Sequence, residues 1–215
     1  MKFNFKRKGD KIVHLSQVPL DFKEAWDLAD LEGRKHDLEW VKEVGQKYLK
    51  CFHEIDEFII HEVFCSAIIV RYGRANSAGR KKKMPGECFE RLTEEEKDNH
   101  EFFMNLRNLH YAHSVNNYES NIPKAWINNI NSSNPGFNQV GVIHERVIRL
   151  STQEIQDIVS LAGKLLLSLE SQIKKEKDKV TEIAKKIPIS QLIQNKFPKI
   201  VTTKKTAGEQ RKRKL

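Results

Sequence analysis

The segment STQEIQDIVSLAGKLLLSLESQIKKEKDKV, residues 151–180, decides the fold class of this chain. Ser151 and Glu154 stand at the spacing of a capping box, in which each side chain binds the backbone N–H of the other residue. The apolar side chains that follow recur every three or four residues, at Ile155, Ile158, Leu161, Ala162, Leu165 and Leu169. This period is that of an α-helix with one buried face. We predict a long helix from Ser151 to about Val180.

Further helices are predicted upstream. Pro19 and Asp21 mark a helix start, and residues 22–45 keep helical spacing, although Gly33 and Gly45 weaken the stretch. Residues 46–72 give the clearest pattern, carried by Tyr48, Phe52, Ile55, Ile59 and Val63. Positions 63–70 are apolar all round, which predicts burial in the core or against a second subunit.

Glycines and a second capping box divide the middle of the chain. Gly73 is expected to end the helix over 46–72, and residues 73–91 read as a loop. Thr93 and Glu96 have capping-box spacing, so a helix should run from there to about Asn117.

The remaining segments predict small or irregular elements. Residues 1–15 alternate in two short runs around a Gly–Asp turn, and residues 139–150 also alternate like a strand. Residues 118–138 are rich in Asn, Ser, Pro and Gly and are expected to be irregular, with Trp126 holding the loop to the body. A short helix is expected near Ser190, and disorder after Pro198.

These elements predict a mainly α fold, a helical bundle of four to five long helices with small peripheral β elements. The domain boundaries follow from composition. Residues 1–18 form an N-terminal segment with short strands, residues 19–182 the bundle, and residues 183–215 a short helix with a basic, flexible tail.

The net charge of +9 is concentrated at the two ends and in one loop. Residues 196–215 hold eight Lys or Arg against one Glu, and residues 1–11 hold five against one Asp. Residues 71–83 hold six basic residues and no acid. Such clusters favour contact with a phosphate backbone or another polyanion. For the tail alone, plain solvation is an equally good reading.

Several classes of protein are disfavoured. The longest apolar run, residues 58–70, is too short to span a membrane and is interrupted by His61 and Glu62. The basic N-terminus has no apolar core of a signal peptide, so we expect the cytoplasm and no membrane. Cys51, Cys65 and Cys88 form no CxxC pair and predict free thiols, the first two as small hydrophobes in apolar helices. No third ligand accompanies the two histidines at 110 and 113, so no metal and no cofactor is expected.

A dense polar cluster occupies the end of the helix predicted over 93–117. It reads RNLHYAHS and contains Arg107, Asn108, His110, Tyr111, His113 and Ser114. Arginine offers a permanent planar donor fork for a phosphate, and histidine exchanges protons near neutral pH. Together they suffice for attack of an RNA 2′-hydroxyl on its own phosphate, with no metal.

The pattern R-N-x4-H, made by Arg107, Asn108 and His113, resembles the signature of HEPN-domain proteins. Many members are metal-independent endoribonucleases of toxin–antitoxin, abortive-infection and RNA-processing systems. The string RNLHYAHS, the preceding RYGRANSAGR and the strand-like stretch before the final helix are similar to the abortive-infection branch, over residues 20–180. The resemblance implies that His113 is the general base or acid, that Arg107 stabilises the phosphate, and that Asn108 orients the site.

An ideal helical wheel leaves the choice of histidine open. At about 100° per residue, His113 lies ~120° away from Arg107, and His110 is the ring beside the arginine. His113 then points with Leu106 and Leu109, which makes a buried core histidine the alternative reading. His110, Tyr111 and Ser114 remain second-rank site residues.

Basic residues of the preceding loop are the expected grip on the RNA backbone. They are Arg71, Arg74, Arg80, Lys81, Lys82 and Lys83. For Arg71 and Arg74 the alternative is pairing with the dipole at a helix C-terminus.

The chemistry also predicts a homodimer. In-line cleavage benefits from a base on one side and an acid on the other, and two copies of one motif supply both. The resemblance implies the same arrangement, so we expect an interface at residues 100–117 and at 46–72. RNA is the expected partner, and an antitoxin protein a further one. The alternatives are a non-catalytic RNA- or protein-binding module and a structural helical protein with a basic tether.

Overall fold

The computed structural model describes residues 5–8, 11–14, 16–77, 83–111, 119–146 and 149–197. It leaves out the side chains of residues 5–8, 11–14, 110, 111, 119–121, 145 and 146. The chain forms two compact units, one of Leu31–Gln172 and the other of Met1–Asp30 with Ile173–Leu215. Helices α1 (Lys23–Cys51) and α4 (Thr152–Lys186) each contribute to both units.

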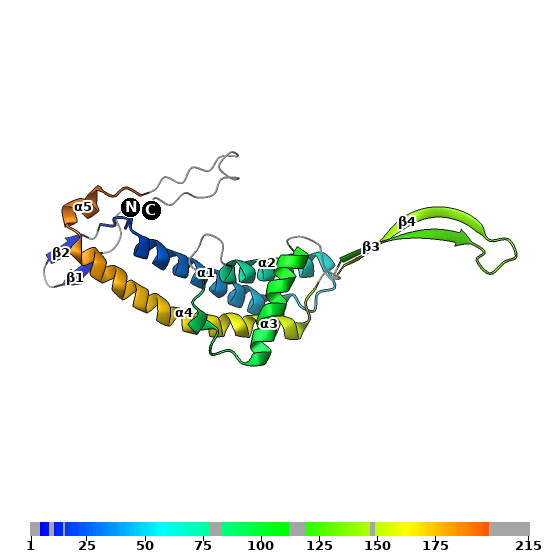
Figure 1. Cartoon of the computed structure of the whole chain (residues 1–215), viewed down its shortest axis with the longest axis horizontal. Coiled ribbons are helices and arrows are strands. Elements are labelled where there is room, and N and C mark those ends of the chain that lie inside the picture. The colour runs from blue at the N-terminus through cyan, green and yellow to red at the C-terminus, as the bar shows by residue number, and fades with distance from the viewer. Residues whose placement is uncertain are drawn as a thin grey trace. The chain divides into compact units, whose positions relative to one another are not determined.

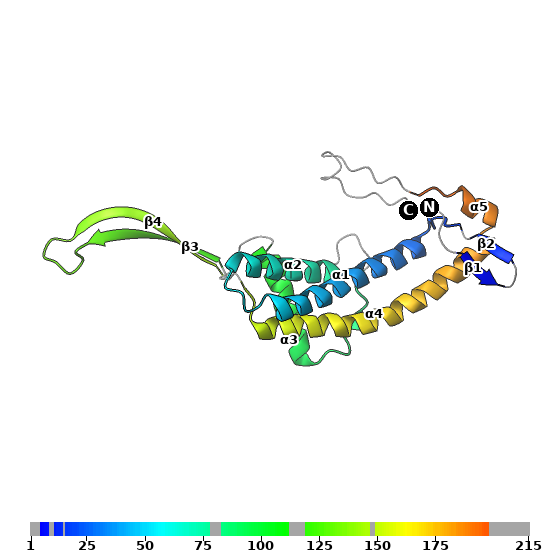
Figure 2. The ribbon, with the colours of Figure 1, turned by 180° about the vertical axis from the view of Figure 1, so that it is seen from behind.

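The larger unit contains the later part of α1, the first part of α4 and two further helices, α2 (Phe58–Asn76) and α3 (Glu94–Asn105). A π-helix, η2 (Leu106–Tyr111), continues α3, and a single 3-10 turn, η1 (Gly86–Cys88), precedes it. Figures 1 and 2 show α3 crossing the direction of α1, α2 and α4 in this unit. The predicted mainly α fold class is therefore confirmed.

A continuous set of apolar side chains fills the core of the larger unit. Its fully buried members include Leu31, Leu38, Val41, Cys65, Ile68, Ile69, Tyr72, Phe103, Ile155, Ile158, Leu161, Ala162, Leu165 and Leu169. Each large aliphatic side chain stabilises the fold by roughly 1.5–3 kcal/mol relative to an exposed one. All six apolar positions predicted on the last long helix are buried, so the pattern of α4 was read correctly.

Both predicted capping boxes are present. Thr93 Oγ1 accepts the backbone N–H of Glu96 at 3.2 Å, and the Glu96 carboxylate accepts that of Thr93 at 3.0 Å. Ser151 and Glu154 make the equivalent pair at 3.2 and 2.6 Å. These bonds use N–H groups that the first turn of a helix leaves unpaired.

The predicted boundary between the first two helices was wrong. Helix α1 continues past Gly33 and Gly45 to Cys51, and α2 begins only at Phe58. At Gly45 α1 lies close to α4, since a Cβ there would be 2.4 Å from Val159 Cγ2. The glycine that seemed to weaken the helix instead permits close helix packing.

Of the two alternatives for the apolar positions of α2, burial in the core is wrong for Ile59 and Val63. These two are 54% and 59% exposed, whereas the helix buries a different side that includes His61 and Cys65. Burial of the exposed positions against a second subunit stays a prediction. Nor does the helix end at Gly73, because it continues to Asn76. The predicted helix ran through the turn between α1 and α2, so the apolar spacing of α1 was continued into α2, where it identified the wrong side as buried.

Residues 118–138 were expected to be irregular, but most of them form an antiparallel hairpin. Strand β3 (Glu119–Asn128) pairs with β4 (Gly136–Arg146), which confirms the strand expected over 139–150 as far as Arg146. Trp126 does not hold a loop to the body: its ring lies over Gly141 of the paired strand, where a Cβ would be 2.6 Å from it.

The smaller unit contains the two predicted N-terminal strands, β1 (Phe5–Lys8) and β2 (Lys11–His14), paired antiparallel. The short helix expected near Ser190 is α5 (Ile189–Gln194). The Asn195 amide, which follows it, donates to the carbonyl of Pro19 at 3.0 Å. The disorder expected after Pro198 lies outside the described residues.

Candidate functional site

Arg107 lies in η2, where the helix continuing α3 changes to i→i+5 hydrogen bonding. Such π-turns are rare in proteins, but those that occur are often found at functional sites. An α-helix was expected to about Asn117, and this prediction was wrong over Leu106–Tyr111, whereas residues 112–117 lie outside the described residues. Capping explains the start of α3, but nothing in the residue spacing indicated the widened turn.

Two neighbours fix the arginine side chain. A Cβ on Gly73 would lie 2.4 Å from Arg107 Cγ and 2.9 Å from its Cδ, so the aliphatic stem crosses α2 at its smallest residue. The guanidinium Nη1 donates to Asn108 Oδ1 at 2.8 Å. Arg107 and Asn108 are both partly exposed. The Arg107 fork is thus held in one place while it remains accessible.

The structure therefore joins two of the three residues of the R-N-x4-H pattern. His113 and Ser114 lie outside the described residues, and of His110 and Tyr111 only the backbone is described. The wheel that placed His113 ~120° from Arg107 assumed a regular α-helix. An i→i+5 turn winds more residues into each turn than the α-helix does, so that angle does not apply here.

Arg71 and Arg74, two of the predicted RNA-binding residues, converge on one buried carboxylate. Asp37 on α1 is 1% exposed, and it accepts from Arg71 Nη1 and from Arg74 Nε, each at 2.8 Å. Arg74 Nη2 also binds Asp37. The hydrogen bond with Asp37 raises the pKa of Arg74 above its ordinary value. The guanidinium of Arg71 stacks on Trp40, 4.8 Å from the ring centroid.

This ion-pair cluster sits at the C-terminal end of α2. Arg34, fully buried, donates to the carbonyl of Ala75 in the last turn of α2 and, at 3.0 Å, to that of Ser77, which follows the helix. Arg71 and Arg74 keep 30% and 51% of their side chains exposed. Lys83 is exposed, while Arg80, Lys81 and Lys82 lie outside the described residues.

His100 on α3 is a partly buried titratable group that the sequence did not single out. Its Nδ1 lies 2.7 Å from the hydroxyl of Tyr72, and its ring packs on Phe89. Burial lowers the pKa of His100 and raises that of Tyr72. The hydrogen bond between this hydroxyl and the ring nitrogen connects α2 with α3.

A second buried pair has the same character. Tyr48 Oη lies 2.6 Å from His61 Nδ1, and His61 Nε2 lies 2.5 Å from the carbonyl of Ile55. Since a carbonyl only accepts, Nε2 carries the proton and the tyrosine donates. Burial raises the pKa of Tyr48 to about 12. Cys65, predicted as a small hydrophobe, is buried beside them, but Cys51 is exposed, contrary to prediction.

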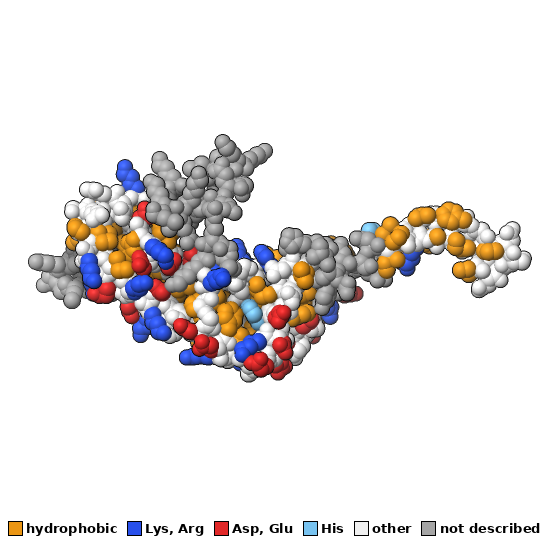
Figure 3. Space-filling model, in the orientation of Figure 1, with side chains coloured by type: hydrophobic (Ala, Val, Ile, Leu, Met, Phe, Trp, Pro, Cys, Tyr) orange, Lys and Arg blue, Asp and Glu red, His pale blue; other side chains and the backbone are white. Residues whose placement is uncertain are grey.

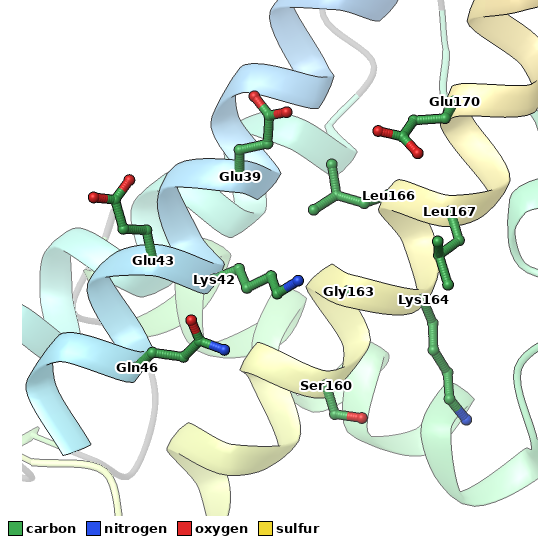
Figure 4. Close-up of a pocket in the computed structure, with 10 residues that line it drawn as sticks. All are labelled: Glu39, Lys42, Glu43, Gln46, Ser160, Gly163, Lys164, Leu166, Leu167 and Glu170. Atoms are coloured by element: carbon green, nitrogen blue, oxygen red, sulfur yellow. The ribbon is translucent and has the colours of Figure 1, made fainter. Parts of the chain in front are cut away.

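An open groove of about 580 Å³ separates α1 from α4 in the larger unit. Figure 4 shows Lys42 and Gln46 of α1 reaching toward α4, whose Ser160 and Gly163 form the opposite wall. The lining combines three glutamates with two lysines and two leucines and contains no histidine. Neither Arg107 nor Asn108 lines it, so it is separate from the candidate site.

Within the described residues, no group of three His, Cys, Asp or Glu side chains is arranged to hold a metal ion. Across the same part of the chain, no helix is both long enough and apolar enough to cross a membrane. Comparisons with known proteins add no family to these observations: no family model, no curated protein and no solved structure matches the chain.

Proposed function

We propose that the chain is a metal-independent endoribonuclease of HEPN type, which cleaves RNA through attack of a 2′-hydroxyl on the adjacent phosphate. The observation that carries the proposal is the fixed, partly exposed Arg107, held by Gly73 and Asn108 in a π-turn. A preorganised cation is what the charge developing on the phosphorus oxygens requires.

The roles follow from the chemistry of each group. His113 removes the proton of the 2′-hydroxyl, whose oxygen attacks phosphorus while the 5′-oxygen leaves with a proton from the second histidine of a dimer. Arg107 stabilises the phosphate. Asn108 accepts a hydrogen bond from Arg107, so its role is to orient the fork. His110, Tyr111 and Ser114 are second-rank residues around the same position.

The basic end of α2 supplies the proposed contact with the RNA backbone. Arg71 and Arg74 each use donors on Asp37 but remain partly exposed, so their outer N–H groups are available to phosphates. Lys83 and the neighbouring Arg80, Lys81 and Lys82 would extend this surface. Substituting the lysines should weaken RNA binding and reduce its salt dependence.

A homodimer through α2 supports a composite site. Ile59, Val63 and Val70 are 54%, 59% and 45% exposed and recur at helical spacing, so they share one side of α2. The stem of Arg107 packs on Gly73, which lies about one turn after Val70 and close to that side of α2. Packing of two such stripes about a two-fold axis would bring both copies of Arg107 toward one cleft.

A toxin–antitoxin or phage-defence role in the cytoplasm, with an antitoxin protein as a second partner, is part of this proposal. The alternative is a non-catalytic HEPN-like RNA- or protein-binding module. It is favoured by the Asp37 cluster, which organises two arginines for binding without providing any group that transfers protons.

The test is cleavage of labelled tRNA and total RNA in EDTA by the wild type and by Arg107→Ala, Asn108→Ala and His113→Ala. Arg91→Ala is the matched control, because Arg91 is an exposed arginine outside the candidate site. We expect products with 2′,3′-cyclic phosphate ends, lost on Arg107→Ala and His113→Ala, reduced on Asn108→Ala and kept on Arg91→Ala. RNA binding without cleavage by the wild type would establish the binding module instead.

A further inference from the structure

The hairpin β3–β4 presents one apolar face that its own strands leave uncovered. Its register pairs Pro123 with Val142, Ala125 with Val140 and Ile127 with Phe137. A bulge between Trp126 and Ile127 leaves Asn138 as an extra residue and keeps Phe137 on the same side as Val140. We call these six side chains the apolar face of the hairpin.

Exposure confirms that this face lacks a partner within the described chain. Phe137 and Val140 are 66% and 68% exposed, and Ile127 and Val142 are 41% and 48% exposed. Figure 3 shows hydrophobic side chains gathered along the hairpin. An isolated two-stranded hairpin is at best marginally stable in water, so a covered face would stabilise it.

The opposite face carries the charged residue of this part of the hairpin. It holds Lys124, Gln139, the pair Ile122–Ile143 and the ring of Trp126, which lies over Gly141. Ile122 and Trp126 are 39% and 42% exposed, so this face is partly apolar as well. Lys124 is the single Lys, Arg, Asp or Glu between Ser120 and His144, and it lies on this side. The two faces therefore differ in one property that decides the partner: the apolar face contains no charge.

We propose that the apolar face of the hairpin packs against the same face of a second copy of this chain. Around a two-fold axis each residue meets its own copy or a symmetry mate, so a charge near the axis would face a like charge. A face without charges meets this requirement. Ala125 and Val140, at the middle of the face, would lie at the axis.

The area and the charges favour this occupant over the others. The six side chains expose roughly 500 Å² together, so a symmetric pair would bury at most about 1,000 Å², near the lower limit of a specific interface. Nucleic acid would need several cations along the ribbon, which has one between Ser120 and His144 and a second, Arg146, only at its base. Insertion into a membrane would need an apolar tip, whereas the turn at residues 129–135, NINSSNP, is mostly Asn and Ser.

The test compares Val140→Glu with Gln139→Glu in the full chain. The two variants add the same charge to adjacent exposed residues on opposite faces of one strand. By sedimentation equilibrium we expect Val140→Glu to weaken self-association at least about tenfold, because like carboxylates would meet at the axis, and Gln139→Glu to change it less than about twofold. Repeating both in a Val63→Glu background removes the contribution of the contact proposed for α2.

Cysteine cross-linking reports the same contact without adding charge. With the exposed Cys51 replaced by Ser, Val140→Cys should form a disulfide between two copies under mild oxidation, and Gln139→Cys should not. The proposal fails if the wild type is monomeric, if both glutamate variants associate equally, or if the two cysteines cross-link equally. If the wild type is monomeric and binds phosphatidylserine vesicles, and Val140→Glu abolishes that binding, the partner of the apolar face is a membrane and the proposal is refuted. Both experiments are carried out without RNA, so their outcome is independent of ribonuclease activity.

Discussion

Replacing Gly73 by alanine tests whether its close contact with Arg107 holds the site together. The new Cβ would lie 2.4 Å from Arg107 Cγ, about 1 Å closer than ordinary van der Waals contact. Because the clash is with the base of the side chain, the whole arginine must move. Overpacking of this kind costs roughly 1–3 kcal/mol, and the gain from alanine in a helix offsets about 1 kcal/mol of it. We expect Gly73→Ala to destabilise the fold by about 1 kcal/mol.

Gly163 on α4 is the matched control, since a Cβ there would meet nothing within 4 Å. Gly163→Ala should therefore stabilise the protein by about 1 kcal/mol through helix propensity alone. Urea unfolding followed by helical circular dichroism measures both variants, and the difference in sign is the critical result. A stabilising effect at both glycines would mean that the Arg107 stem does not occupy the space above Gly73.

A double-mutant cycle locates the clash on Arg107 itself. Arg107→Ala removes Cγ and Cδ, the two atoms closest to the new methyl group, and leaves Cβ at 3.1 Å. In that background Gly73→Ala should become nearly neutral, a coupling of about 1 kcal/mol between the two residues. An unchanged penalty would refute the reasoning, because the cost would then come from another part of α2.

Two further predictions concern polar groups at least partly removed from water. Asp37→Asn should lower the free energy of unfolding in urea by about 2 kcal/mol, less than the loss of a fully buried pair, because both arginines reach water. The control is Glu39→Gln at an exposed ion pair, which should change the free energy of unfolding by less than about 0.5 kcal/mol. Burial lowers the pKa of His100 below its ordinary value of 6.5, so just below pH 6.5 only the unfolded chain binds a proton at this residue. The free energy of unfolding should therefore fall as the pH drops below 6.5, and His100 should have no effect on it above that pH. His100→Asn, which keeps an acceptor for Tyr72, should flatten the dependence measured between about pH 7 and 5; an unchanged slope would assign it to another group.

The sequence was most informative where a local rule has one outcome. The Thr93–Glu96 and Ser151–Glu154 spacings identified both helix starts because a capping box depends only on residues three apart. The periodicity of α4 identified its buried face for the same reason. Helix boundaries were less certain, since the apolar spacing around Tyr48 continued across a turn that carries no Gly or Pro.

The hairpin and the site depended on information that spacing does not contain. Pro123 and the Asn-rich turn suggested a loop, yet a two-stranded ribbon has only edge strands, where proline is tolerated. The contact of Arg107 with Gly73 joins residues from different helices and follows from tertiary packing alone. The cationic side chains of α2 were identified, but their common anchor, Asp37, lies 34 residues before Arg71 and gave no local signal.

The widened turn of η2 also has a consequence for insertion and deletion. A turn closed over five residues contains one residue more than the α-helical turns before it. Deleting Leu109, which is 44% exposed, would restore regular winding and leave the capped start of α3 in place. The direction in which the chain leaves the helix would then change by about 100°. Deletion of a single codon in η2 would thus change the direction of the segment that follows the helix.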